Sequence, residues 1–536
     1  MIGKRSNSIE VPVSAESFEK IHDFIEEKLS RNNTSREIKS ETLLVFEALF
    51  YNLLDQGFDK DTLLTVRITR SFGEIHIDLG FEGKPFAAFR GTEDSPSPED
   101  SILRAYEDKF DHSYWNGYNH IHIAVKRSFL NTLLLGFGAL LLAILVYIPI
   151  NAFVSIGDQD VIADTIVFPL VKLFSNAMLM VGAPVTFFSL LKNFTDIYVI
   201  SERNSAGRRL QMKTIVTSVI SVILAIVAGF IIAFIAKDAL SELSDGTWIG
   251  GTTPSFSELI DSLVPSSIFA PFETIMPVPV IIVAMIVTYA FCTVGRYFNK
   301  MKKAIDACYT LFSRMLQVIM YAFPVFCFLA LLYPLLGEGY GTLLLILEGI
   351  ALAAASLVLL AAFYLIRLLV GGVKLRPFFK HLPALLKENY QIGSAIDAVP
   401  FNIRYCVKNY GMDRKRISDK FPVLAQINLD GNCYLIMLIG MMFIFLMGDR
   451  ASWYHIVVIA ILVVFLSFGA PNQPGSILIG TLIIALFLKG DVLIPTAVYL
   501  EVFLGGAQNL INVAGDVVTV AIEEKQIGRA SCRERE

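Results

Sequence analysis

Residues 457–488 read VVIAILVVFLSFGAPNQPGSILIGTLIIALFL, an apolar segment interrupted by FGAPNQPGS at Phe468–Ser476. A helix needs about 20 apolar residues to cross a bilayer, so the segment is long enough to do so. The two prolines and two glycines of the interruption stop a helix there, because proline has no backbone N–H to donate. Irregular backbone at membrane depth is tolerated only where protein or a water-filled cavity covers it. We therefore expect either a substrate-binding element of a transporter or an ordinary pair of proline-kinked helices.

A second interrupted segment, Lys387–Cys406, reads KENYQIGSAIDAVPFNIRYC and is too short and polar to span a membrane. It lies between two basic segments that we place on the same side of the membrane. We interpret it as a re-entrant hairpin with Gly393–Pro400 at its tip. Paired interrupted segments of this kind point to the substrate site of a secondary transporter.

The composition divides the 536-residue chain into two parts. Residues 1–125 are mixed and charged, as in a globular domain, whereas long apolar runs alternate with short charged loops from Ser128 onward. A mean hydropathy of +0.58 is unusual for a soluble protein, whose surface must carry charge. The formal net charge of −4 indicates no nucleic-acid partner. The six cysteines are scattered without a CxxC pair, which favours small core residues over a metal or disulfide site.

The charges of the loops predict the orientation of the chain in the membrane. Basic loops, such as Arg203–Lys213, alternate with acidic ones, such as Asp238–Asp261, and short loops rich in Lys and Arg stay in the cytoplasm. The N-terminal domain is therefore predicted to be cytoplasmic, in a multi-pass protein of the plasma (inner) membrane. Six spans are predicted before residue 375, over residues 128–150, 165–195, 213–237, 265–295, 304–335 and 341–371.

Two short motifs place acidic side chains inside apolar helical surroundings. Asn428–Asn432 reads NLDGN and Asn512–Asp516 reads NVAGD. Carboxylates such as those of Asp430 and Asp516 are expensive inside a membrane and mark candidate ion pathways. Each motif combines an amide, a carboxylate and a glycine that can free backbone carbonyls, and hard cations take oxygen ligands. The alternative is a pair of buried, hydrogen-bonded acids that bind no ion.

These two motifs occur together with Ser394–Pro400 in the first interruption and Gln473–Gly475 in the second. In order and spacing the four resemble the dicarboxylate/amino acid:cation symporter family, which has the glutamate-transporter fold, and the resemblance covers about residues 125–525. It implies a polytopic α-helical membrane protein with eight transmembrane helices plus two re-entrant hairpins. It also implies an elevator-type moving domain, a homotrimer, and transport instead of enzymatic activity.

The resemblance assigns candidate residues to two sodium sites and one substrate site. Asp516, Asn428 and Asn512 would frame one sodium site. Asp430 and Asn428, with Ser221 in the third span, would frame another. The substrate-binding candidates, at the hairpins and on the last helices, are Ser394, Asp397, Asn432, Gln473, Gln508 and Asn509. Sodium is expected as the coupling ion, with no other cofactor.

The substrate candidates depart from the family pattern. Gln508 stands where dicarboxylate carriers have an arginine, Gly505 where amino-acid carriers have an aspartate, and Asn432 where the family has a threonine. A neutral amide cannot replace the bidentate grip of a guanidinium on a carboxylate. We therefore expect a cation-coupled symporter within the dicarboxylate/amino-acid class, with a diverged site that suits a neutral or zwitterionic small polar solute. Asp397 would hold a substrate amine, carry a coupled proton, or face cytoplasmic water. The alternative function is a membrane sensor that signals through its cytoplasmic domain.

Residues 1–125 are predicted to form an α+β domain. Helices are expected over residues 17–29 and 38–54, and strands over residues 63–69, 74–79 and 119–126. Glu47–Asn52 (EALFYN) and Asp78–Gly83 (DLGFEG) resemble the N-box and the DxGxG turn in the ATP-binding domain of histidine kinases and anti-sigma factors. Both motifs are imperfect, so we favour a purely structural module, or one that binds a cytoplasmic protein partner, over degenerate nucleotide binding. Its histidines, His76, His112, His120 and His122, are expected on strand surfaces and not as metal ligands.

The last ten residues, Ile527–Glu536, are basic and differ in character from the rest of the chain. We interpret them as a non-native tail. The predicted organisation is thus a cytoplasmic domain over residues 1–125, a transmembrane symporter domain over 126–525, and this tail.

Overall fold

The structure is a computed structural model of the chain. It describes residues 7–32, 34, 36–58, 62–71, 74–88, 103, 106, 109–125, 129–203, 205–236, 254–262, 264–274, 277–294, 297–392, 394–396, 398–418, 420–446, 452–469, 476–488 and 493–533. The chain divides into two compact units, Met1–Asn131 and Thr132–Glu536. Each unit has a hydrophobic core of its own.

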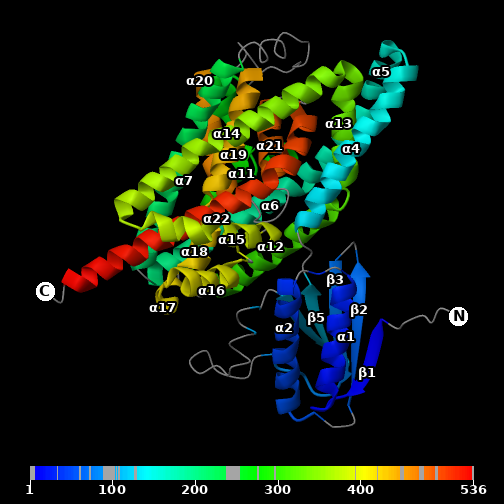
Figure 1. Ribbon diagram of the computed structural model, residues 1–536, viewed down its shortest axis with the longest axis vertical. Helices are drawn as coiled ribbons and strands as arrows, with labels where there is room; N and C mark the ends of the chain where they lie inside the picture. Colours follow the sequence, from blue (N-terminus) through cyan, green and yellow to red (C-terminus); the bar gives the residue numbers. More distant parts are fainter. Residues whose placement is uncertain are drawn as a thin grey trace. The chain divides into compact units, whose positions relative to one another are not determined.

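The first unit is a two-layer α+β fold (Figure 1). Its five strands are β1 (Ser8–Pro12), β2 (Leu63–Ser71), β3 (Glu74–Glu82), β4 (Phe110–Trp115) and β5 (Tyr118–Val125). They form an antiparallel sheet in the order β1-β2-β3-β5-β4. Helices α1 (Ser17–Arg31) and α2 (Arg36–Asp55) cover the sheet. The alternation along β5 explains the layers, because Ile121, Ile123 and Val125 are buried while His120 and His122 are exposed.

Both predicted helices and all three predicted strands of this unit are present. The sequence patterns did not predict β1 and β4, because each is a short edge strand with little apolar alternation. Asp78–Glu82 of the proposed turn motif lies within β3 instead of in a turn. His120 and His122 lie on the exposed face as predicted, but His76 is buried and stacks on the His122 ring at 4.8 Å.

The described residues of the second unit form helices joined by short connections, with no strand among them. Its first helices are α4 (Phe129–Phe153), α5 (Ile156–Ile162), a π-helical turn (Ala163–Val167), α6 (Phe168–Arg203), α7 (Ser205–Ile235), α9 (Phe256–Ser262), α10 (Ala270–Thr274), α11 (Pro277–Thr293), α12 (Phe298–Met320), α13 (Phe323–Glu338) and α14 (Tyr340–Gly371). The later ones are α15 (Leu375–Ile392), α16 (Val399–Tyr410), α17 (Arg414–Ser418), α18 (Phe421–Ile427), α19 (Asp430–Leu446), α20 (Trp453–Gly469), α21 (Ser476–Phe487) and α22 (Leu493–Arg533).

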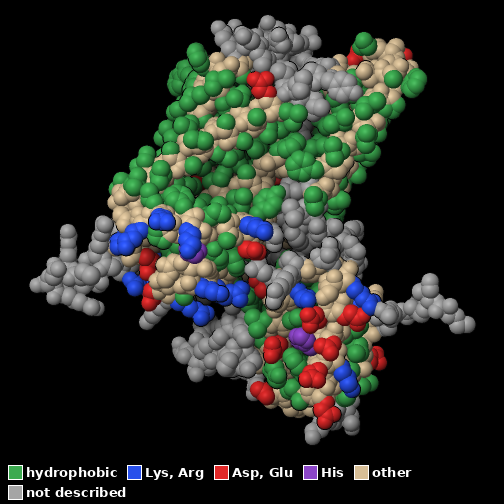
Figure 2. All heavy atoms as spheres, viewed as in Figure 1, with side chains coloured by type: hydrophobic (Ala, Val, Ile, Leu, Met, Phe, Trp, Pro, Cys, Tyr) green, Lys and Arg blue, Asp and Glu red, His purple; other side chains and the backbone are tan. Residues whose placement is uncertain are grey.

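Several of these helices could cross a membrane. By length and composition, five candidate spans occur among the described residues, over Leu134–Phe153, Ile156–Asp196, Arg208–Ile235, Leu347–Gly371 and Arg416–Leu446. The bent pair α12–α13 counts as a sixth if it is one span. On the face that Figure 2 shows, the surface of this unit is largely apolar, and Lys and Arg side chains gather at one end of it. An apolar belt beside a basic end is what a lipid-facing surface and a cytoplasmic rim require.

Four predicted spans, over residues 128–150, 165–195, 213–237 and 341–371, coincide with α4, α6, α7 and α14. The region predicted as one span over residues 304–335 bends by 55° between α12 and α13. Pro324 lies in the first turn of α13, and a proline cannot donate the hydrogen bond that would continue a helix through the bend. The helix within residues 265–295 is also shorter than predicted, because α11 begins only at Pro277.

The two interrupted segments both break where the sequence indicates. Helices α15 and α16 pack against each other, and the amides of Asn389 and Asn402 exchange hydrogen bonds of 2.7 and 3.1 Å across the pair. The Tyr405 hydroxyl donates to the His381 carbonyl oxygen at 2.9 Å, which makes the pair antiparallel. Helix α20 ends at Gly469 and α21 begins at Ser476, and residues 470–475 between them lie outside the described residues. The re-entrant placement of both segments in a membrane stays a prediction.

The first unit is expected to fold without the second. A fragment of residues 1–125 should unfold cooperatively in urea, because its core is self-contained. Phe46 is fully buried and stacks on Phe18, so Phe46→Ala should cost the fragment about 3–5 kcal/mol in the free energy of unfolding. Trp115→Ala is the control, since that side chain is 74% exposed, and should change stability by less than about 0.5 kcal/mol. A fragment that shows no cooperative transition would refute this expectation.

Candidate cation and solute site

The glycines of the two motifs allow α19, α22 and the chain before α19 to approach closely. A Cβ atom on Gly431 would overlap the backbone carbonyl oxygen of Gln508 and stand 3.0 Å from the Asn512 side-chain oxygen. A Cβ atom on Gly515 would stand 2.7 Å from the Asn428 amide nitrogen and 2.8 Å from the Tyr364 hydroxyl. Such distances are too short for a side chain, so only glycine permits this packing.

The two motifs differ in backbone structure. Asn428 and Leu429 form a non-helical break between α18 and α19, and Asn428 has φ −87° and ψ 80°. The second motif, in contrast, lies within the unbroken helix α22. The break frees backbone groups beside Asp430, whereas α22 contributes its side chains alone.

Asp430 is fully buried where α7, α14 and α19 meet. The Ser218 hydroxyl of α7 donates a hydrogen bond to one carboxylate oxygen at 3.1 Å. The Tyr364 hydroxyl of α14 donates to the other at 3.0 Å. These two hydroxyl donors hold the carboxylate in place but are themselves uncharged.

Asp516, the last residue of the second motif, lies on α22 and is 1% exposed. The Asn428 amide nitrogen donates to its carboxylate at 2.8 Å and to the Asn512 carbonyl oxygen at 3.4 Å. The side-chain oxygen of Asn428 is buried and has no hydrogen-bond partner among the described residues. Asn428 therefore connects the two motifs and has one buried side-chain oxygen without a hydrogen-bond partner among the described residues.

Both ends of the Asn512 side-chain amide make hydrogen bonds that join α22 to α19. Its side-chain oxygen accepts from the Gly431 backbone N–H at 2.8 Å, and its amide nitrogen donates to the Asn432 side-chain oxygen at 2.9 Å. All of these groups are buried. The two motifs, about eighty positions apart in the sequence, thus form one hydrogen-bonded unit.

This donor set is chemically suited to a hard monovalent cation. It offers two carboxylates, the unpartnered oxygen of Asn428 and the backbone freed at the break before Asp430. Hard cations prefer such oxygen ligands, and a buried carboxylate that makes no direct ion pair among the described residues favours a cation. The residues present therefore fit a sodium ion by the chemistry of their donors.

Ser221 takes a different position from the one predicted for it. Its hydroxyl is buried and donates to the Thr217 carbonyl oxygen of its own helix at 3.0 Å. Ser218, one turn earlier on α7, is the serine that contacts Asp430. Sequence reasoning also missed Tyr364, which lies 66 positions before Asp430. Only the packing of α14 against the motif identifies it.

The described solute candidates are tied to helices on either side of α22. The Gln508 amide and the Ser476 hydroxyl at the start of α21 are in mutual hydrogen-bond contact at 2.6 and 2.8 Å. The Asn509 amide nitrogen donates to the Asn389 carbonyl oxygen of α15 at 3.1 Å. Ser394 is buried in the turn between α15 and α16. Asp397 and Gln473 lie outside the described residues.

Comparison with family models matches residues 132–526 to the sodium:dicarboxylate symporter family. The chain belongs to this family. The match covers nearly all of the second unit and begins where that unit begins. A search of curated proteins finds no match. The family consists of symporters, which agrees with the predicted membrane transport and with the expectation that the chain is not an enzyme.

The symporter family match does not extend into the first unit. The predicted kinship of residues 1–125 with ATP-binding domains has no support from the comparisons. In the structure, Asp78 of the proposed nucleotide motif is engaged by its neighbours. Its carboxylate accepts from the Thr69 hydroxyl at 3.1 Å and contacts the His122 ring nitrogen at 2.6 Å.

One acid of the symporter unit was not singled out from the sequence. Glu501 on α22 is 3% exposed, and one carboxylate oxygen accepts from the Leu478 backbone N–H at 2.8 Å. It therefore caps the first turn of α21, where the helix dipole favours negative charge. Its other oxygen lies 2.6 Å from where a Cβ atom on Gly505 would stand. The missing side chain at Gly505 thus makes room for Glu501.

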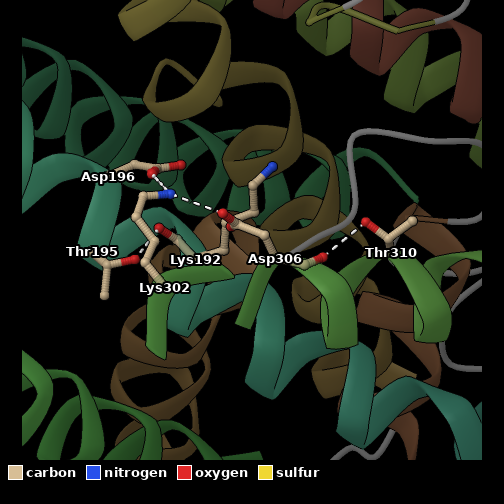
Figure 3. Close-up of polar contacts among 6 residues, drawn as sticks. All are labelled: Lys192, Thr195, Asp196, Lys302, Asp306 and Thr310. Atoms are coloured by element: carbon tan, nitrogen blue, oxygen red, sulfur yellow. Dashed lines mark hydrogen bonds and ion pairs between the residues drawn. The ribbon is translucent and has the colours of Figure 1, made fainter. Parts of the chain in front are cut away.

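A second polar cluster lies apart from the motifs and joins α6 to α12 (Figure 3). The Lys302 ammonium contacts the carboxylates of Asp196 at 2.7 Å and Asp306 at 3.1 Å. The Lys192 ammonium lies 4.8 Å from the centre of the Tyr309 ring. These contacts connect the two helices and take no part in the network around Asp430.

Gly431→Ala should destabilise the protein in detergent, because the added methyl meets backbone that cannot rotate away. We expect a cost of about 1–3 kcal/mol, measured as a lower midpoint of thermal unfolding. Gly138→Ala is the matched control in a helix, since a Cβ atom there meets nothing within 4 Å. It should change the midpoint little. Equal midpoints for the two variants would show that α19 and α22 tolerate a wider separation.

Proposed function

We propose that the second unit is a sodium-coupled symporter for a small polar organic solute that is neutral or zwitterionic. The observation that carries this proposal is the buried network of Asp430, Asp516 and Asn428. The unpartnered amide oxygen of Asn428 and the two buried carboxylates favour the binding of a cation. The family match supplies the transporter class, and the residues of the network supply the reason for an ion.

The coupling would follow from the connections between the two motifs. A cation at Asp430 and Asp516 would reduce the repulsion between the two carboxylates. Asn512 joins α19 to α22 through both ends of its amide, and Gln508 lies one helical turn away on the same helix. An ion that holds this part of α22 in place would therefore also hold Gln508, which we propose binds the solute, in place.

The solute site would recognise its ligand through hydrogen bonds to a neutral amide and not through a negative charge on the ligand. Gln508 offers an amide donor and acceptor, both in contact with Ser476. A solute that replaces Ser476 as the partner of this amide would separate the start of α21 from α22. Asn509, on the other side of α22, would remain bonded to α15. Because only the contact to α21 would have to open, the solute would enter at the start of α21.

The remaining expectations from the family resemblance belong to the same proposal. The helix pairs α15–α16 and α20–α21 would be the two re-entrant hairpins that complete eight transmembrane helices. The unit would move as an elevator within a homotrimer in the plasma (inner) membrane, with the N-terminal unit in the cytoplasm. The gathering of Lys and Arg at one end of the second unit (Figure 2) supports that end as the cytoplasmic one.

A sensor function is the second candidate, and the separate first unit favours it. That unit has its own core and lies outside the family match. The chain after β3 is tied to α2 and β5, because Gln56 bonds Ala87 through both ends of its amide and Asn119 bonds the backbone of Lys84 and Phe86. We therefore propose a partner-binding module instead of a nucleotide-binding one. Uptake of labelled solutes into proteoliposomes separates a transporter from a sensor.

Sodium should stabilise the purified protein more than potassium or choline at equal ionic strength. An ion that binds only the folded state adds about 2.7 kcal/mol at 100 times its dissociation constant. Asp516→Asn should reduce this sodium-dependent shift in the unfolding midpoint, because it removes a charge that the cation requires. Asp196→Asn, in the α6–α12 cluster, is the control for loss of a partly buried, ion-paired charge elsewhere. Identical midpoints in the three salts would refute sodium coupling.

Substitutions of Gln508 should change solute binding and leave sodium binding in place. Gln508→Ala should weaken the solute by about one hydrogen bond, roughly 0.5–1.5 kcal/mol. Gln508→Arg should weaken the native solute further and favour an acidic one, since a guanidinium pairs with a carboxylate. A solute screen by thermal shift, with and without sodium, provides the measurement. Unchanged solute affinity in Gln508→Ala would remove this residue from the site.

A further inference from the structure

The network around Asp430 has a positively charged neighbour that neither motif contains. Arg367 lies on α14, three positions after Tyr364 and therefore about one turn along the same face. Its guanidinium donates to the Thr519 hydroxyl at 2.9 Å and lies 6.0 Å from the centre of the Tyr364 ring. The side chain is half-buried within an apolar helix, where a charged residue is rare and costly.

Two routes connect this guanidinium to the buried carboxylate of Asp430. Along α14, Tyr364 contacts the guanidinium with its ring and Asp430 with its hydroxyl. Along α22, Thr519 donates to the Gly515 carbonyl oxygen at 2.8 Å. The position of a Cβ atom on Gly515 would lie 3.2 Å from the Asp430 carboxylate. The side chain of Tyr364 thus lies between the Arg367 guanidinium and the Asp430 carboxylate and contacts both.

The guanidinium of Arg367 lies over the rings of Phe363 and Tyr364, at 5.6 and 6.0 Å from their centres, and its hydrogen bonds alone do not account for the charge. One terminal nitrogen bonds Thr519, but the other is buried and has no hydrogen-bond partner among the described residues. A neutral amide at this position would satisfy Thr519 at a lower desolvation cost. What a guanidinium adds, and a glutamine could not, is a permanent positive charge beside the carboxylates.

We infer that Arg367 is a resident counter-charge for the Asp430–Asp516 pair, and that it lowers by one the number of monovalent cations that the pair takes up. The inference rests on the proposed ion coupling at these carboxylates. Two carboxylates can be balanced by two mobile cations, or by one mobile cation and one cation covalently held by the chain. Arg367 acts on the ion through the field at Asp430 and does not ligate it, so it determines stoichiometry and affinity.

The test compares Arg367→Gln with two controls in the full chain. Equilibrium binding of radioactive sodium and the unfolding midpoint in sodium or choline are measured on the same preparations. Arg367→Gln should bind one more sodium ion per chain than the parent, with about tenfold tighter half-saturation because a repelling charge is gone. It should also be less stable than the parent in choline and recover in sodium.

The controls separate charge from hydrogen bonding. Arg367→Lys keeps the positive charge, so it should retain the sodium stoichiometry of the parent. Thr519→Val removes the hydrogen bond and keeps the guanidinium, so it should lower the midpoint equally in both salts. An Arg367→Gln protein with the parent's sodium stoichiometry and half-saturation would overturn the inference, even if it were less stable.

The same experiment distinguishes a failure of the inference from a failure of the proposed function. Sodium binding by the parent tests the function, and the change in Arg367→Gln tests the counter-charge. If the parent binds no sodium, coupling by sodium is refuted for the parent. The inference then still requires Arg367→Gln to acquire sodium binding, and an unresponsive variant would overturn it too.

Discussion

The second unit depends on the burial of two carboxylates, Asp430 and Asp516, among apolar helices. An uncompensated charge in such surroundings costs several kcal/mol, so the structure must supply partners for both groups. It does so with donors from several helices, namely Ser218 on α7, Tyr364 on α14 and Asn428 at the break before α19. The arrangement of these helices around one point follows from that requirement.

This concentration of polar groups is possible only because the helices approach closely. Gly431 and Gly515 leave no room for a side chain, and their neighbours are backbone and amide atoms of the same network. The glycines therefore serve packing as much as backbone freedom. In α22 the backbone stays helical through Gly515, so its role there is to admit Asn428 and Tyr364.

The residues that we propose for the ion and for the solute lie next to each other on α22 but make different kinds of contact. Asn512 and Asp516 belong to the charged network, whereas Gln508 and Asn509 make neutral hydrogen bonds to α21 and α15. A neutral solute-binding residue, Gln508, beside a charged ion site is consistent with a solute that changed while the proposed coupling to an ion was retained. In our inference the fixed positive charge of Arg367 also affects the ion site, because it determines how many mobile cations the same carboxylates require.

The sequence alone determined the membrane character, the positions of the main spans, the two interruptions and the two motifs, because hydropathy, proline and glycine act locally. Both helices of the first unit were predictable for the same reason. Tertiary structure decided which side chains meet. Ser218 instead of Ser221 contacts Asp430 because of the rotation of α7 about its axis, which no local pattern specifies. Tyr364, Arg367 and Glu501 gained their roles from helices that pack against the motifs from distant parts of the chain. The short edge strands β1 and β4 were likewise decided by pairing with their neighbours, since their own sequences carry little alternation.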